Sequence, residues 1–128
     1  MKLLLDTHAV VWAVLSVDKL SFAAIEAITS PQNTVFVSIA SPWEIAIKTG
    51  LGKWPEARSL IDTFEASMQM AGFELLPITV PHVREAGFLR SPHRDPFDRV
   101  LASQAKIEGL QLVTADAKLK ALAGPVIW

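Results

Sequence analysis

Lys2-Leu3-Leu4-Leu5, followed by Asp6-Thr7-His8, is the stretch that decides the fold. Three consecutive leucines are typical of a short strand buried on both faces, as in parallel sheets, and Asp6 ends that strand with a charge. Short apolar runs recur between longer segments of helical period, and this alternation is typical of an α/β fold with a mainly parallel sheet. We expect four or five strands, at Lys2–Leu5, Thr34–Ser38, 74–77, 110–114 and 126–128.

Composition narrows the class of protein further. The 128 residues are 51% hydrophobic and 20% charged, and 12 Lys+Arg against 13 Asp+Glu give a formal charge of −1. The length predicts a single domain over residues 1–128, the apolar content excludes a disordered chain, and the charge balance excludes a uniformly basic nucleic-acid-binding protein. The absence of cysteine excludes disulfides, zinc–thiolate sites and thiol nucleophiles, and it suits a reducing compartment.

The apolar segments are too short for export or for a membrane. Asp6 interrupts the N-terminal run, and the longest uncharged apolar stretch, residues 9–15, falls far below the roughly 18 residues that a spanning helix needs. We therefore expect a cytoplasmic protein without a membrane-bound part.

Helix start and stop signals separate the expected strands. Residues of the capping type precede four helical segments, and two glycines follow helical segments. The starts are Ser21, Ser41, Thr79 and Asp95, the stops are Gly72 and Gly109, and residues 50–55 are expected to form a loop.

Acidic residues stand where the strands end. In open α/β sheets ligands bind beyond the carboxyl ends of the strands. Asp6 ends the first strand, Glu44 follows the second, Asp116 follows Thr114, and Asp98 lies one turn into the helix before the fourth strand, three residues after Asp95.

Each acid also has a purely structural interpretation. Ser41 to Glu44 has the spacing of a capping box, and Asp95 can cap a helix whose dipole favours Asp98. Asp6 is harder to explain in this way, because a carboxylate directly after a buried strand is desolvated unless something pairs with it. As a group, carboxylates in one crevice repel one another and need a cation, and an all-oxygen set suits Mg²⁺ or Mn²⁺. Such ions support phosphodiester hydrolysis.

These residues resemble the PIN-domain ribonucleases, and among them the VapC-type toxins of toxin–antitoxin pairs. The resemblance runs along the whole chain through four strings in the same order. They are residues 3–8 (LLLDTH), 38–48 (SIASPWEIAIK), 93–99 (HRDPFDR) and 114–116 (TAD).

The resemblance implies a three-layer α/β/α fold and a metal-dependent endoribonuclease. It assigns Asp6, Glu44, Asp98 and Asp116 to the catalytic, metal-binding set, with Mg²⁺ or Mn²⁺ as the cofactor. Asp6 and Asp98 are the expected direct ligands, whereas Asp116 either holds a second ion or supports a ligand. Asp95 matches the family pattern less well than Asp98.

The resemblance also implies hydroxyl groups and cations around the acids. Thr7 and Thr114 are expected to orient carboxylates or water. Cations that contact RNA phosphates are expected among Lys48, Arg90, Arg94 and Arg99, although each of them is equally typical of a solvated surface or of a partner for a nearby acid. The implied partners are an RNA substrate, a VapB-like antitoxin whose extended tail blocks the acidic crevice, and a second copy of the chain.

The remaining conspicuous side chains favour structural roles. We interpret His8 as a surface or supporting group, His82 as part of a helix start and His93 as part of the turn into Asp95. The helix that contains Trp12 is apolar all round, so core packing is favoured for Trp12, as it is for Trp43 and Trp54, with a partner surface as the alternative.

Two other enzyme classes fit less well. A haloacid-dehalogenase-like phosphatase needs a second Asp two residues after the first, where this chain has His8. A receiver domain needs a phosphorylated Asp at a later strand end and a Lys after the last strand, and neither is convincing. The alternative outside enzymes is a catalytically inactive PIN-like interaction module.

Overall fold

The computed structural model describes all 128 residues and contains one four-stranded parallel sheet with the strand order β3-β2-β1-β4. The strands are β1 (Lys2–Leu5), β2 (Thr34–Ser38), β3 (Glu74–Leu76) and β4 (Gln111–Val113). The α/β class and the parallel sheet are confirmed. The expected fifth strand at 126–128 is reduced to a single bridge between Val113 and Ile127.

Eight α-helices and two 3₁₀ helices connect the strands. The α-helices are α1 (Thr7–Leu15), α2 (Phe22–Thr29), α3 (Ala40–Gly50), α4 (Arg58–Asp62), α5 (Phe64–Ala71), α6 (Val80–Phe88), α7 (Pro96–Glu108) and α8 (Ala117–Ala123). The 3₁₀ helices are η1 (Val17–Lys19) and η2 (Pro55–Ala57). The expected loop at 50–55 is shorter than predicted, because α3 continues to Gly50 and η2 begins at Pro55.

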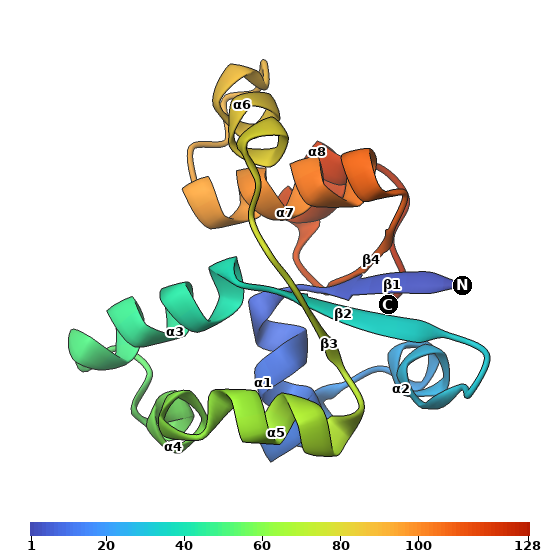
Figure 1. The fold of residues 1–128 in the computed structure, drawn as a ribbon, viewed down its shortest axis with the longest axis vertical. Helices are drawn as coiled ribbons and strands as arrows, with labels where there is room; N and C mark the ends of the chain where they lie inside the picture. The colour runs from blue at the N-terminus through green and yellow to red at the C-terminus, as the bar shows by residue number, and fades with distance from the viewer.

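The helices cover both faces of the sheet and make three layers (Figure 1). α1, α2 and α5 lie on one face, α7 and α8 lie on the other, and α6 lies beyond α7. The alternation of side chains in β1 explains both cores: Leu3 and Leu5 join a cluster with α1 and α5, while Leu4 joins a cluster with α7 and α8. All three leucines are fully buried, and each contributes about 2 kcal/mol to folding.

Polar side chains and glycines set the helix ends. Asp6 Oδ1 accepts a hydrogen bond from Ala9 N at 2.7 Å, and Ser21 Oγ accepts one from Ala24 N at 3.1 Å. Gly72 and Gly109 end α5 and α7 with φ angles of 75° and 66°, a left-handed conformation that glycine adopts without a steric penalty. The start at Ser21 and both stops were predicted, whereas the capping of α1 by Asp6 was not.

The tryptophans divide between core and surface. Trp54 is buried, Trp12 is partly buried, and Trp43 is 57% exposed on α3, where it makes an edge contact with Phe97 at 5.1 Å between ring centroids. The expectation that Trp43 packs in the core is therefore wrong.

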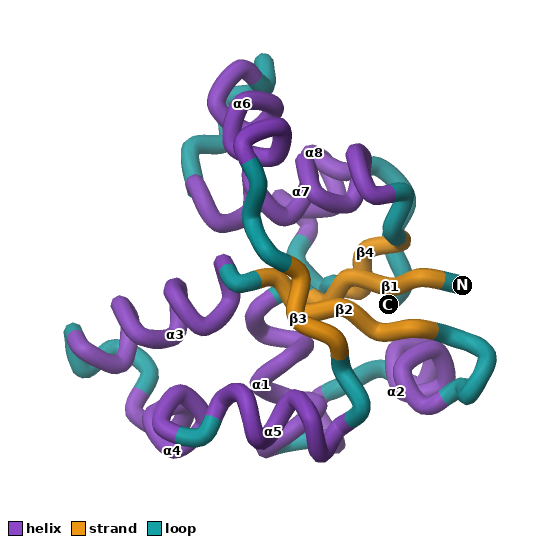
Figure 2. The backbone as a smooth tube through the Cα atoms, in the orientation of Figure 1, coloured by secondary structure: helices purple, strands orange, loops and turns teal.

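The parallel order brings the carboxyl ends of the strands to one edge of the sheet (Figure 2). Leu5 is in register with Val37 of β2 and with Val113 of β4, so the residues that follow these three strands meet at one edge. No helix of the chain is long and apolar enough to cross a bilayer.

Candidate active site

Asp6 is the most firmly held acid at this edge. It follows β1 directly and caps α1 through Ala9 N, while its Oδ2 accepts a hydrogen bond from the Thr114 hydroxyl. Only 6% of the residue is exposed. The carboxylate is therefore fixed by groups from two strand ends and one helix.

Burial sets the protonation of Asp6. Desolvation raises its pKa above the ordinary value, and the negative charge of Asp116 raises it further. The hydrogen bonds from Thr114 and Ala9 and the proximity of His8 lower the pKa without cancelling the effect of burial. A cation beside Asp6 would stabilise the charged carboxylate.

Asp116 lies next to Asp6 through the same threonine. Thr114 Oγ1 accepts a hydrogen bond from Asp116 N at 3.0 Å while it donates to Asp6, and Asp116 Oδ1 accepts from Lys118 N at 2.8 Å at the start of α8. Asp6 and Asp116 line one open cavity of about 280 Å³. Thr114 therefore links the Asp6 carboxylate to the main chain of Asp116.

Asp98 approaches from the other side, in the first turn of α7. Its Oδ2 lies 2.8 Å from His93 Nε2, and its pKa is raised to about 6. Burial is the largest cause, the hydrogen bond from His93 lowers the pKa, and the charges of Asp95 and Asp116 raise it. Asp95 itself is the N-cap of α7 and accepts from Phe97 N at 2.9 Å.

Arg99 supports the loop that carries His93. Its guanidinium donates to the main-chain oxygens of Ala86 at 2.9 Å, Leu89 at 2.5 Å, His93 at 2.8 Å and Ser91 at 3.4 Å. The expectation that Arg99 contacts RNA phosphates is therefore replaced by a role in shaping residues 89–93.

Glu44 forms an ion pair with Lys48 rather than a cluster with the other acids. It is buried on α3, and its Oε2 lies 2.6 Å from Lys48 Nζ. The capping-box interpretation is wrong, because α3 already begins at Ala40 and the Ser41 hydroxyl lies 3.1 Å from Thr7 Oγ1. Thr7 thus bonds to a serine and not to a carboxylate.

His82 has the structural role that its sequence context predicts. It is 1% exposed, its Nδ1 accepts from Thr79 N at 3.0 Å, and its Nε2 lies 2.7 Å from Glu108 Oε1. The ring therefore joins the start of α6 to the end of α7.

The donor chemistry of the edge suits a hard divalent cation, but its geometry is open. Asp6, Asp98 and Asp116 are all carboxylates, and the charge of Asp116 raises the pKa of both other acids. No three histidine, aspartate or glutamate side chains are close enough together to hold one ion between them.

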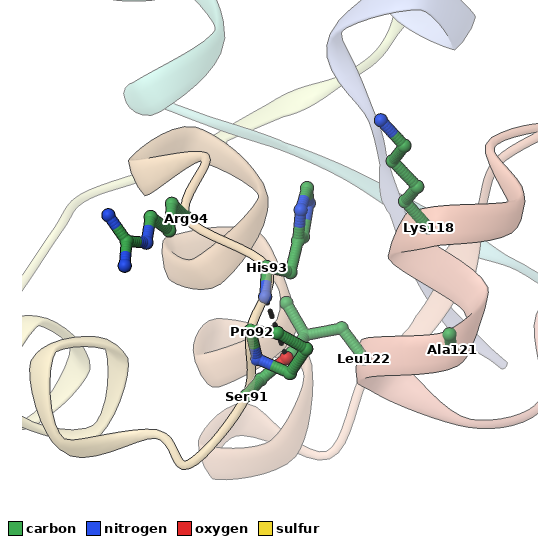
Figure 3. Close-up of a pocket in the computed structure, with 7 residues that line it drawn as sticks. All are labelled: Ser91, Pro92, His93, Arg94, Lys118, Ala121 and Leu122. Atoms are coloured by element: carbon green, nitrogen blue, oxygen red, sulfur yellow. Dashed lines mark hydrogen bonds between the residues drawn. The ribbon is translucent and has the colours of Figure 1, made fainter.

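A wider cavity of about 680 Å³ adjoins this region (Figure 3). His93 lines it, with Arg94 on one side in this view and Lys118 on the other. Lys118 was not among the cations that the sequence singled out, although its position two residues after Asp116 was the available signal. Arg90 and Arg94 are exposed, and Lys48 lies 5.6 Å above the Trp54 ring as well as beside Glu44.

Comparison with known families identifies the domain. The model of the PIN domain matches residues 3–125. The chain belongs to the PIN domain family. No curated protein matches it significantly.

Solved structures share the fold at low sequence identity. VapBC2 from Rickettsia felis, solved with a DNA fragment from the promoter, is 20% identical, with a TM-score of 0.67 and coverage of 98% of this chain and 96% of that one. A toxin–antitoxin complex from Klebsiella pneumoniae is 19% identical, with a TM-score of 0.61 and coverage of 98% and 96%. FitAcB from Neisseria gonorrhoeae is 20% identical, with a TM-score of 0.57 and coverage of 98% and 95%.

Proposed function

We propose that this PIN domain, a single unit over residues 1–128, is a metal-dependent endoribonuclease of the cytoplasm and the toxin of a toxin–antitoxin pair. The observation that carries the proposal is the linkage of Asp6 and Asp116 through Thr114 at the carboxyl edge of the sheet, with Asp98 in electrostatic range of Asp116. The similar folds in toxin–antitoxin complexes support the assignment to such a pair.

The residues that would hold Mg²⁺ or Mn²⁺ are Asp6, Asp98 and Asp116, with Glu44 as a further acid once Lys48 releases it. When bound, the ion supplies a neutralising charge for the phosphate and a lower pKa for a water molecule. The water oxygen attacks phosphorus in line with the 3′-oxygen, the bond from phosphorus to that oxygen breaks, and the 3′-oxygen takes up a proton. No covalent enzyme intermediate is required.

The chain's own residues orient the acids and bind the RNA. Thr114 and Ala9 N hold the Asp6 carboxylate in one orientation, and His93 faces Asp98. Arg94 and Lys118 flank the wider cavity and offer charges to the RNA backbone, as do Arg90 and Lys48. An antitoxin segment that covers this edge would exclude RNA, and a homodimer is the proposed assembly.

Cleavage of total cellular RNA tests the proposal. The purified chain, free of antitoxin, is incubated with Mg²⁺, Mn²⁺ or EDTA beside the Asp6→Asn and Asp98→Asn variants. Asparagine caps helices as well as aspartate does, so Asp6→Asn retains the start of α1. We expect discrete fragments that need the metal ion and a loss of at least about 100-fold in both variants, because even residues that only support a metal ligand cost 10- to 100-fold.

Asp18→Asn is the matched control, because it makes the same substitution at an exposed residue of η1. Its cleavage rate is expected to equal that of the wild type. Wild-type rates in Asp6→Asn and Asp98→Asn would show that the site is wrong. No cleavage by the folded wild type with either ion would favour the inactive interaction module instead.

A further inference from the structure

His8 and Trp12 form an aromatic wall beside Asp6 and Asp116. They are four residues apart on α1, so both side chains lie on the same face of the helix. Together with Asp6, Ala115 and Asp116 they line the cavity of about 280 Å³. Two aromatic rings and two acids of the proposed nuclease site therefore line the same cavity.

The wall is part of a longer row of rings. The ring centroids of Trp128 and Trp12 are 5.8 Å apart, those of Trp12 and His8 are 5.5 Å apart, and those of His8 and Trp54 are 4.7 Å apart. Trp54 is only 8% exposed, whereas His8 is exposed and makes no hydrogen bond within the chain. An exposed imidazole supported by a buried indole is a rigid surface with both ring nitrogens available.

A second cavity continues on the other side of His8. It measures about 240 Å³ and is lined by His8, Lys48, Lys53 and Trp54. His8 thus borders one cavity with carboxylates and an indole, and another with two lysines. Alternating aromatic and cationic groups along a groove are typical of surfaces that bind single-stranded nucleic acid.

We propose that the cavity lined by His8 and Trp12 binds one nucleobase of single-stranded RNA, adjacent to the bond that is cleaved. Because the two rings are tilted by 58° to one another, the base stacks on one of them and meets the other at its edge, and Lys48 and Lys53 bind the neighbouring phosphate. Asp116 Oδ2, which has no partner within the chain, accepts a hydrogen bond from an exocyclic amino group of the base. This inference rests on the proposed ribonuclease function and adds to it a site for base recognition.

Binding of short fluorescent RNA oligonucleotides tests the inference in an Asp98→Asn background, where cleavage is blocked outside this cavity. His8→Ala and Trp12→Leu are compared on an intact oligonucleotide and on a series with an abasic residue at each position in turn. We expect each variant to weaken binding about tenfold, within the range measured for the loss of one stacked base. At one position, the abasic residue should weaken binding as much, and combining it with either variant should cause no further loss.

Two controls separate stacking from folding and from charge. His8→Phe keeps a flat ring and is expected to bind as the parent does. Phe22→Ala removes a ring that is 82% exposed on α2 and lines none of these cavities, and it is expected to leave binding unchanged. Thermal unfolding confirms that each variant is folded.

The outcomes distinguish the inference from the proposed function. RNA binding in which the losses from His8→Ala and from every abasic position simply add would overturn the base site. Binding that is unchanged by His8→Ala and by Trp12→Leu would overturn it too. In both cases the nuclease proposal stands. If the parent and all variants fail to bind RNA, the proposed function fails and the base site fails with it.

Discussion

Asp6 and Asp98 belong to the same candidate site but are held by different kinds of structure. The supports of Asp6 are Ala9 N in α1 and the hydroxyl of Thr114, which follows β4 directly, so regular elements place both of them. Asp98 faces His93, whose loop is shaped by the guanidinium of Arg99. One half of the site therefore depends on the sheet and the other half depends on a single side chain.

The largest effect is expected from replacing Arg99, whose guanidinium shapes the loop that carries His93. Arg99→Met leaves four main-chain oxygens without their donor, so the free energy of unfolding should fall by about 2–4 kcal/mol. Cleavage should fall as well, because the loop no longer holds His93 against Asp98. Urea unfolding and cleavage rates at several salt concentrations measure both effects.

Arg94→Met is the matched control for this experiment. Arg94 is exposed beside the wider cavity, so its loss should leave stability unchanged and reduce the salt dependence of RNA binding. The reverse result, in which Arg99→Met is as stable as the wild type but binds RNA with a weaker salt dependence, would make Arg99 a phosphate contact after all.

A smaller effect is expected from weakening the half that depends on the sheet. Thr114→Val removes the donor to Asp6 and the acceptor of Asp116 N, which should cost about 1–2 kcal/mol of stability and 10- to 100-fold in cleavage. Because the Thr114 hydrogen bond lowers the pKa of Asp6, the pH at which activity appears should rise.

Two further variants sharpen this result. Thr114→Ser keeps the hydroxyl and should restore activity and the pH profile. Thr7→Val removes an equally buried hydroxyl that bonds only to Ser41, so it should lower stability without shifting the pH profile. A pH profile that is the same in Thr114→Val and Thr114→Ser would show that the hydroxyl does not set the ionisation of Asp6.

The position of Asp6 at the edge of the sheet was predictable from the sequence because it depends on local sequence features. Three leucines before Asp6 indicate a central strand, and parallel strands place the residues that follow them at one edge. The same reasoning led to Asp116, whereas the resemblance to the family pointed to Thr114. The prediction of a fifth strand was wrong, because the end of the chain pairs with β4 only at Ile127.

Asp98 was also predicted, but the side chains that support it were not, because their contacts are set by tertiary structure. Nothing in the spacing of Arg99 indicates that four main-chain oxygens of residues 86–93 converge on its guanidinium. Similarly, the spacing of Ser41 and Glu44 fits a capping box, but α3 begins two residues earlier than that box requires and leaves the Ser41 hydroxyl to Thr7. Short polar patterns fit several partners, and packing selects among them.

The smallest expected effect concerns the stability that the folded chain loses because Asp98 is charged and partly buried. Its pKa is about 6 in the folded chain against an ordinary value of 3.8, so between about pH 4 and pH 6 the folded chain binds more protons than the unfolded chain. The contribution of Asp98 to stability therefore falls as the pH rises through this window, and the penalty is complete at pH 7. Asp98→Asn should raise the free energy of unfolding at pH 7 without metal by about 1 kcal/mol and change it little at pH 4.

Urea unfolding of the wild type, Asp98→Asn and the surface control Asp18→Asn at pH 4, 5, 6 and 7 measures this difference. Mg²⁺ should stabilise the wild type more than Asp98→Asn, because the ion offsets a repulsion that the variant has already lost. If Asp98→Asn is instead less stable than the wild type at pH 7, the contact with His93 outweighs burial. Asp98 would then be a stabilising ion pair, and the contrast with Asp6 would lie only in which elements hold each acid.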